Sequence, residues 1–158
     1  MKKNRVYVVF DHLKDMLIFS EIKSKCCSDV EDEMFFTVDT EKNGNQWNSL
    51  KAALKSASVI LVLVDDNSKY LGGQYKTEIA LAIDLEKPII VVNINGERSL
   101  DIENCPIELR DKFVLHISKD YHIVNCAIRF WPLYFEENVG RGLRSMYLDD
   151  AIYHKYNL

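Results

Sequence analysis

The stretch from Ala57 to Asn95 decides the fold, and it reads ASVILVLVDDNSKYLGGQYKTEIALAIDLEKPIIVVNIN. It contains two apolar, largely β-branched runs, Val59–Val64 and Ile89–Val92, which are typical of strands buried on both faces. Between these runs, Gln74–Leu85 carries apolar residues at helical spacing. A strand, a helix and a second strand in this length predict a βαβ unit with parallel strands and a right-handed crossover.

Strands and helices alternate in the same way along the rest of the chain. The expected strands are 5–10, 34–38, 59–64, 89–92 and 113–117, and the expected helices are 14–28, 46–56, 74–85 and 122–131. This order predicts an α/β three-layer sandwich of the flavodoxin-like kind, with a five-stranded parallel sheet in the order 2-1-3-4-5. Because proline disrupts a helix interior, Pro132 is expected to end the last of these helices. We therefore divide the chain into a domain at 1–132 and a C-terminal tail at 133–158, packed on the same domain.

Composition and charge exclude several classes of function. The net charge of −4 disfavours nucleic-acid binding, which needs clustered positive charge. No apolar run approaches the ~18 residues of a membrane-spanning helix, and the first residues lack the apolar core of a signal peptide. The four cysteines, Cys26, Cys27, Cys105 and Cys126, match no zinc or C-x-x-C spacing. We therefore expect a cytoplasmic protein with free thiols, no metal site, no nucleic-acid partner and no membrane partner.

In an open parallel sheet, ligands bind beyond the carboxyl ends of the strands, at the point where the strand order reverses. The predicted order places that point between the first and third strands. It brings the run Phe10-Asp11-His12 beside Asp65 and Asn67. The chain has no P-loop, no dinucleotide G-x-G-x-x-G and no G-x-S-x-G nucleophile elbow, so these three kinds of site are not expected.

A phosphoacceptor receiver domain is one alternative with the same topology. Asp11 and Asp65 occupy the positions where a receiver carries its acidic residues. A receiver also needs a lysine-proline pair after its fifth strand, whereas Lys87-Pro88 precedes the fourth strand here. This interpretation therefore depends on the fold alone.

The segment 49–97 resembles the TIR-like family of bacterial anti-phage operons and, within it, the TIR-like signalling proteins of Thoeris systems. The familiar helix pattern of that family, W-x-x-x-E-I-x-x-A, is matched by Glu78, Ile79 and Ala82, and its following K-P-I-I by residues 87–90. The opening RVYVVFDHLKD is similar to the family's first strand and the aspartate after it. The resemblance covers about four fifths of the chain. Gln74 stands where the family usually has Trp, and the tail after Pro132 has no counterpart.

The resemblance implies cleavage of NAD at the nicotinamide–ribose bond, with Glu78 as the catalytic residue. A fixed carboxylate stabilises the oxocarbenium character that develops on the ribose and binds ribose hydroxyls. Nicotinamide leaves as a neutral base, so NAD is the substrate and no cofactor or metal is required. The product is a cyclic or a linear ADP-ribose, and in the family's setting it is a second messenger that activates an effector protein. Self-association of the enzyme is also expected.

The remaining candidates are expected to bind the substrate, and each also has a structural interpretation. Phe10 and Tyr75 are able to stack on a ring of the ligand or to belong to the core. Asp11 is either a helix cap or a ligand contact, and His12 contacts a phosphate or is simply exposed. Asp65 and Asn67 follow the third strand, where Asn67 caps a turn or donates to a pyrophosphate.

Glu78 itself is expected to face a hollow large enough for a sugar, at the rim where the first and third strands end. The alternative is a glutamate on the solvent face of its helix. If the site binds no nucleotide, the same fold serves as a non-enzymatic interaction module that holds partner proteins together.

Overall fold

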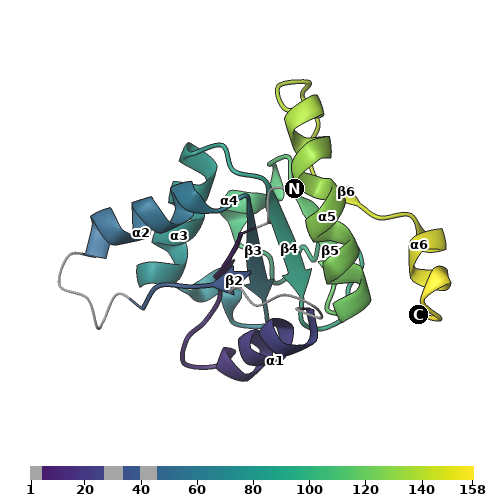
Figure 1. Cartoon of the computed structure of the whole chain (residues 1–158), viewed down its shortest axis with the longest axis horizontal. Helices are drawn as coiled ribbons and strands as arrows, with labels where there is room; N and C mark the ends of the chain where they lie inside the picture. The colour runs from purple at the N-terminus through teal and green to yellow at the C-terminus, as the bar shows by residue number, and fades with distance from the viewer. Residues whose placement is uncertain (1–4, 27–33, 40–45) are drawn as a thin grey trace.

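The computed structural model describes residues 5–26, 34–39 and 46–158, and shows a parallel sheet with helices on both faces (Figure 1). The strands are β1 (Val6–Val9), β2 (Phe35–Phe36), β3 (Val59–Val64), β4 (Ile89–Asn93), β5 (Leu115–Ser118) and β6 (Met146–Tyr147). Their order is β2-β1-β3-β4-β5-β6, and all neighbours pair in parallel. The α/β class and the order of the first five strands are confirmed, and the sheet is consistent with a flavodoxin-like fold.

The predicted number of strands is wrong, because the tail adds a sixth. In β6, Met146 lies opposite Leu115 and Tyr147 opposite His116, so the tail extends the sheet beyond β5. This strand is only two residues long, and it lacks the apolar run by which the central strands are recognised.

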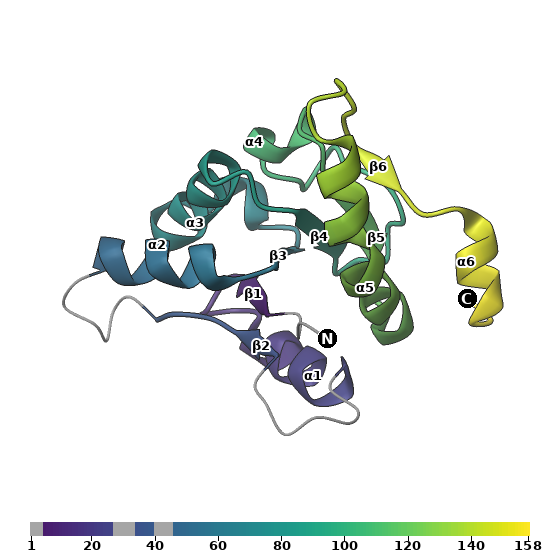
Figure 2. The ribbon, with the colours of Figure 1, turned by 45° about the horizontal axis from the view of Figure 1, so that its top comes forward.

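Helices cover both faces of the sheet, which explains why β1, β3 and β4 are apolar throughout. On one face lie α1 (Met16–Cys26) and α5 (Tyr121–Asn138). On the other face lie α2 (Gln46–Ser56), α3 (Gly73–Asp84) and the short α4 (Ile107–Arg110) (Figures 1 and 2). Each face has its own apolar core, because successive strand residues point to opposite sides of the sheet.

Helix α5 continues past Pro132, so the expectation that this proline ends the helix is wrong. The aromatic residues around the proline explain its continuation. Trp131 is buried and packs edge-on against Phe113 at 5.0 Å, and Phe135, one turn later, stacks on the same ring at 5.4 Å. These contacts anchor the helix on both sides of Pro132, and tertiary packing of this kind overrides a local helix breaker.

After β6 the chain forms α6 (Asp150–Lys155), which stands at the edge of the molecule in both ribbon views (Figures 1 and 2). Its Tyr153 is fully buried, and the Tyr153 hydroxyl accepts a hydrogen bond from the Ser118 amide at 3.2 Å. The Arg98 guanidinium lies over the Tyr153 ring at 4.2 Å. Tyr153 therefore attaches the C-terminal residues to the end of β5, and Tyr156 adds a stacking contact with His122.

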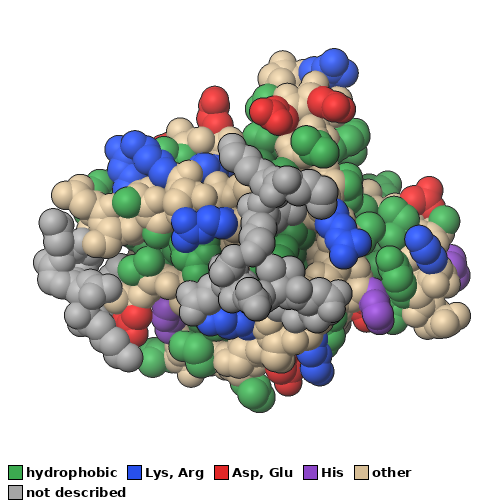
Figure 3. All heavy atoms as spheres, viewed as in Figure 1, with side chains coloured by type: hydrophobic (Ala, Val, Ile, Leu, Met, Phe, Trp, Pro, Cys, Tyr) green, Lys and Arg blue, Asp and Glu red, His purple; other side chains and the backbone are tan. Residues whose placement is uncertain are grey.

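The cysteines, the distribution of charge on the surface and the lengths of the helices bear on the expectations drawn from composition. Cys105 and Cys126 are free thiols, Cys26 is buried with its sulfur 3.8 Å from the Tyr121 carbonyl oxygen, and Cys27 lies outside the described residues. On the face shown in Figure 3, Lys and Arg side chains are distributed over several elements and do not form one patch. Within the described ranges, no helix has the length and apolar character needed to cross a membrane.

Candidate functional site

Glu78 lies in the second turn of α3, and its side chain is fully buried on the side of the helix that faces the sheet. It is the only acidic residue of α3 besides the exposed Asp84 at the helix end. The interpretation of Glu78 as a solvent-facing helix residue is therefore wrong. A carboxyl group at this depth is unfavourable when ionised unless it has partners, so its surroundings decide what it can do.

The surroundings of Glu78 are formed by β1, the residues after β2, and the first turn of α3. Tyr7 of β1 is fully buried, and its hydroxyl accepts a hydrogen bond from the Val38 amide at 3.3 Å. One turn before Glu78, the Gln74 side chain donates to the Val38 carbonyl at 2.6 Å. The backbone of Val38 is thus held from both sides by the same two residues that lie next to Glu78.

The carboxyl of Glu78 is poorly satisfied in this arrangement. Among the described residues, no group makes a hydrogen bond of good geometry to either carboxylate oxygen. Burial raises the pKa of Glu78 to about 8, while the neighbouring Tyr7 hydroxyl and Gln74 amide act in the opposite direction. Glu78 is therefore mostly protonated at pH 7 and ionises as the pH approaches 8, and a strongly shifted pKa of this kind is common among acids of catalytic sites.

Within the described residues Glu78 is fully enclosed, so it does not face an open, sugar-sized hollow as expected. A cleft of about 500 Å³ lies at the opposite edge of the sheet and is lined by the residues that follow α2 and α3 and by the second half of α5. A smaller one, of about 110 Å³, lies between α3, α4 and the short helix η1 (Ser68–Tyr70). Neither is lined by Glu78. The reason is the contact of Gln74 with Val38, which joins α3 to the segment after β2 over the carboxyl.

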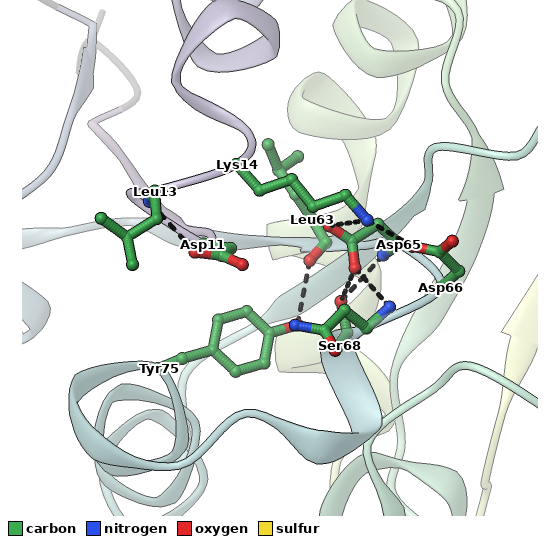
Figure 4. Close-up of polar contacts among 9 residues, drawn as sticks. Asp11, Leu13, Lys14, Leu63, Asp65, Asp66, Ser68 and Tyr75 are labelled. Carbon is green, nitrogen blue, oxygen red and sulfur yellow. Dashed lines mark hydrogen bonds and ion pairs between the residues drawn. The ribbon is translucent and has the colours of Figure 1, made fainter.

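A second polar group of residues lies at the end of β3 (Figure 4). The Asp65 carboxyl is almost fully buried, and its Oδ1 accepts hydrogen bonds from the Asn67 amide at 2.7 Å and the Ser68 hydroxyl at 3.3 Å. Lys14 forms an ion pair with Asp66 and lies 3.7 Å from Asp65 Oδ2. Asp65 therefore shapes the turn after β3, and Lys14 joins that turn to the segment after β1.

Asp65 has a buried carboxyl neighbour in Asp15. Burial, together with the hydrogen bond and the negative charge of Asp65, raises the pKa of Asp15 to about 7. Burial also acts to raise the pKa of Asp65, but the hydrogen bonds from Asp15 and the Asn67 amide and the charge of Lys14 outweigh it, so this pKa is lowered. The two carboxyls therefore hold one proton between them, on Asp15, near neutral pH.

The residues that follow β1 have largely structural contacts. Phe10 is buried and stacks between His12, at 4.3 Å, and Phe19, at 4.8 Å. Asp11 accepts a hydrogen bond from the Leu13 amide at 3.0 Å, as a residue does when it initiates a turn. His12 is half-buried, and its Nε2 lies 3.4 Å from the Thr37 hydroxyl. Phe10 is thus a core residue in this structure, and His12 and Asp11 line the rim above it.

The last two candidates, Asn67 and Tyr75, differ in their exposure to solvent. Asn67 is exposed in the turn after β3, beside Asp65 as predicted. Tyr75 is buried, and its hydroxyl donates to the Leu63 carbonyl at 2.9 Å (Figure 4). The Tyr75 ring is thus part of the core beneath α3 and is covered in this structure. The candidates form two groups, one around Asp65 and one around Glu78, on the same edge of the sheet.

Three residues of the second group had no role in the sequence-based prediction: Tyr7, Thr37 and Val38. Tyr7 could have been found, because a tyrosine in a strand buried on both faces needs a partner for its hydroxyl. Val38 acts through its backbone, and Thr37 belongs to a segment that is irregular after β2. Neither carries a signal in the sequence.

The comparisons with known proteins add no relative to this picture. No protein-family model matches the chain, and no curated protein matches it. Among the residues that the structure describes, no group of three or more His, Cys, Asp or Glu side chains could hold a metal ion.

Proposed function

We propose that this protein is a TIR-like, NAD-consuming enzyme that cleaves the nicotinamide–ribose bond to produce a cyclic or linear ADP-ribose. The observation that supports this proposal is the buried carboxyl of Glu78 in the second turn of α3, to which no described residue makes a hydrogen bond of good geometry. A structural glutamate would be expected to have its oxygens satisfied, because an unpaired buried carboxyl destabilises the fold. Retention of such a group is typical of a site that acts on a ligand.

In the proposed reaction, the Glu78 carboxylate faces the ribose that carries nicotinamide. As the bond between ribose C1′ and the nicotinamide nitrogen breaks, its electron pair leaves with the neutral base and positive charge develops on the ribose. A carboxylate held in a dry environment stabilises this charge more strongly than it would in water. The nucleophile is water for a linear product or another group of the same molecule for a cyclic one.

The rest of the substrate would lie along the ends of β1 and β3. The exposed Asn67 side chain provides hydrogen-bond donors for the pyrophosphate of NAD at this edge. Lys14 would contribute its charge to the pyrophosphate only by leaving its ion pairs with Asp66 and Asp65. For the ribose to reach Glu78, the Gln74 side chain would leave the Val38 carbonyl, so the proposal requires this contact to open when NAD binds.

The direct test is nicotinamide release from NAD by the purified protein over a wide range of protein concentrations, because self-association is part of the proposal. We expect Glu78→Gln to lose at least 100-fold in rate, as enzymes do without a key electrostatic group. Glu86→Gln is the matched control, since Glu86 is exposed beyond the far end of α3. Equal rates for Glu78→Gln and the wild type would reject the proposal.

A non-enzymatic interaction module is the second candidate, and the surface of α1 favours it. Leu13, Met16 and Leu17 are 99%, 46% and 71% exposed at the start of this helix. Such a group of apolar side chains is typical of a surface that meets another protein. Titration calorimetry with NAD and ADP-ribose separates the two candidates, because a module of this kind binds neither nucleotide.

If the protein is the proposed enzyme, then in the anti-phage setting of the family its nucleotide product would reach its effector protein by diffusion.

A further inference from the structure

Tyr7 is the residue next to Glu78 that the proposed reaction does not yet use. Its ring is fully buried in β1 and packs edge-on against Phe36 at 5.3 Å, so the position of its hydroxyl is fixed by the core. The Val38 amide donates to this hydroxyl at 3.3 Å and occupies one of its acceptor positions. The hydroxyl hydrogen therefore remains available for donation to an acceptor.

We infer that the Tyr7 hydroxyl is a positioning group for Glu78, donating its hydrogen to the carboxylate and holding it in its ionised, reactive form. The inference rests on the proposed function, because it assigns Tyr7 a role in the same site. An ionised Glu78 at this depth needs donors, and within the described residues Tyr7 and Gln74 are the side chains that act on it.

The ionisation of the two groups agrees with this assignment. Burial and the negative charge of Glu78 raise the pKa of Tyr7 far above its ordinary value. Tyr7 therefore keeps its proton over the pH range in which Glu78 titrates and is able to donate there. Glu78 changes its charge near pH 8, because burial raises its pKa to about 8 although the neighbouring Tyr7 hydroxyl and Gln74 amide act to lower it.

The substitution that isolates this donor is Tyr7→Phe, which removes the hydroxyl and keeps the ring. Because one hydrogen bond to the carboxylate is lost, the ionised form of Glu78 becomes less favourable. A net hydrogen-bond contribution of the usual size corresponds to a rise of roughly 0.5–1 pH unit in the midpoint of the Glu78 titration. Tyr153→Phe is the matched control, because it also removes a buried hydroxyl that accepts a backbone hydrogen bond, but at the end of β5.

The measurement is an NMR titration of side-chain carboxyl carbons in protein labelled at glutamate, with the Glu78 signal identified by its absence in Glu78→Gln. We expect the midpoint to rise in Tyr7→Phe and to stay unchanged in Tyr153→Phe. Equal midpoints in Tyr7→Phe and the wild type would overturn the inference, and so would an equal rise in both tyrosine variants. If Tyr7→Phe does not fold, replacement of all tyrosines by 3-fluorotyrosine, a stronger donor, is expected to lower the midpoint, and no change would overturn the inference.

Nicotinamide release measured across the same pH range separates this inference from the proposed function. If both are correct, the acid limb of the Tyr7→Phe rate profile moves to higher pH by the same amount as the midpoint. A shifted midpoint without NAD cleavage by any variant keeps the role of Tyr7 toward Glu78 and rejects NAD as the substrate. A shifted midpoint with an unmoved rate profile rejects the catalytic part of the inference.

Discussion

Burial of Glu78 has a consequence for stability that does not depend on catalysis. An acid whose pKa is raised in the folded state, here from 4.5 to about 8, keeps its proton there while the unfolded chain has already lost it. The folded state therefore loses stability as pH rises from about 4.5 to 8. Glu78 is in this sense a group that the fold tolerates at a cost, as functional groups often are.

We therefore predict that Glu78→Gln is more stable than the wild type at pH 8 and that the difference shrinks toward pH 5. The expected difference at pH 8 is a few kcal/mol, on the order of 1.4 kcal/mol for each unit by which the pKa of Glu78 is raised. Urea unfolding at several pH values measures it. A variant less stable than the wild type at pH 8 would show that the carboxylate has partners that this account does not include.

Whether the role of a single residue can be predicted from the sequence depends on whether it acts through its side-chain type or through a contact that only the fold creates. Glu78 is predicted through its match to the helix pattern of the family that the chain resembles, and Asp65 through its place at the end of a strand. Phe10 and Tyr75 were placed at the right edge, but the sequence does not show that both rings turn into the core. The contact over Glu78 is made by the Gln74 side chain with the Val38 carbonyl, and the sequence does not indicate it because a backbone acceptor is available at almost any residue.

At the scale of elements, α5 is the helix that departs most from its prediction, and its first turn is well capped. The Asp120 carboxylate accepts hydrogen bonds from the amides of His122, at 2.9 Å, and Ile123, at 3.2 Å. We predict that Asp120→Ala lowers the free energy of unfolding by about 1 kcal/mol. Thermal unfolding measures this change, with Asp120→Asn as the variant that keeps a capping oxygen and most of the stability.

The tail provides a second prediction at this scale. Tyr153 is the buried residue that attaches α6 to the end of β5. Tyr153→Ala is expected to destabilise the protein by about 3–5 kcal/mol if the tail unfolds together with the sheet, as removal of a buried aromatic side chain does. Hydrogen exchange of the β5 amides then increases with that of α6. Unchanged exchange in β5 would mean that α6 unfolds separately.

Elements differ in how far their sequence determines them. The central strands β3 and β4 are apolar on both faces, so their pattern leaves no alternative, and both were predicted nearly to the residue. The short strands β2 and β6 have two residues each, and they depend on the neighbour with which they pair. The extension of α5 past Pro132 depends on aromatic contacts with Phe113, which lies far away in sequence.

At the scale of the whole molecule, a buried histidine contributes to the response of stability to acid. His116 in β5 is fully buried, and within the described residues neither of its ring nitrogens has a hydrogen-bond partner. Burial lowers its pKa to about 4, whereas the unfolded chain takes up the proton near pH 6.5. The unfolded state thus binds more protons between these two values, so stability falls as the pH decreases through this window.

We predict that His116→Leu removes this part of the pH dependence. The wild type is expected to lose up to about 3 kcal/mol between pH 7 and pH 4 through His116, and the variant to lose correspondingly less. Guanidinium unfolding at pH 7, 5.5 and 4.5 measures the slope. A slope that is equal in the two proteins would show that His116 is protonated in the folded state.

The central claim is that the ribose of NAD meets the Glu78 carboxyl at the edge formed by β1 and the start of α3. A crystal structure of the protein with a non-cleavable NAD analogue tests it most directly. The account predicts a Glu78 carboxylate oxygen within hydrogen-bond distance of a hydroxyl on the nicotinamide ribose, with Gln74 turned away from the Val38 carbonyl. A dinucleotide bound elsewhere, with Glu78 still enclosed beneath Gln74 and Val38, would contradict the account.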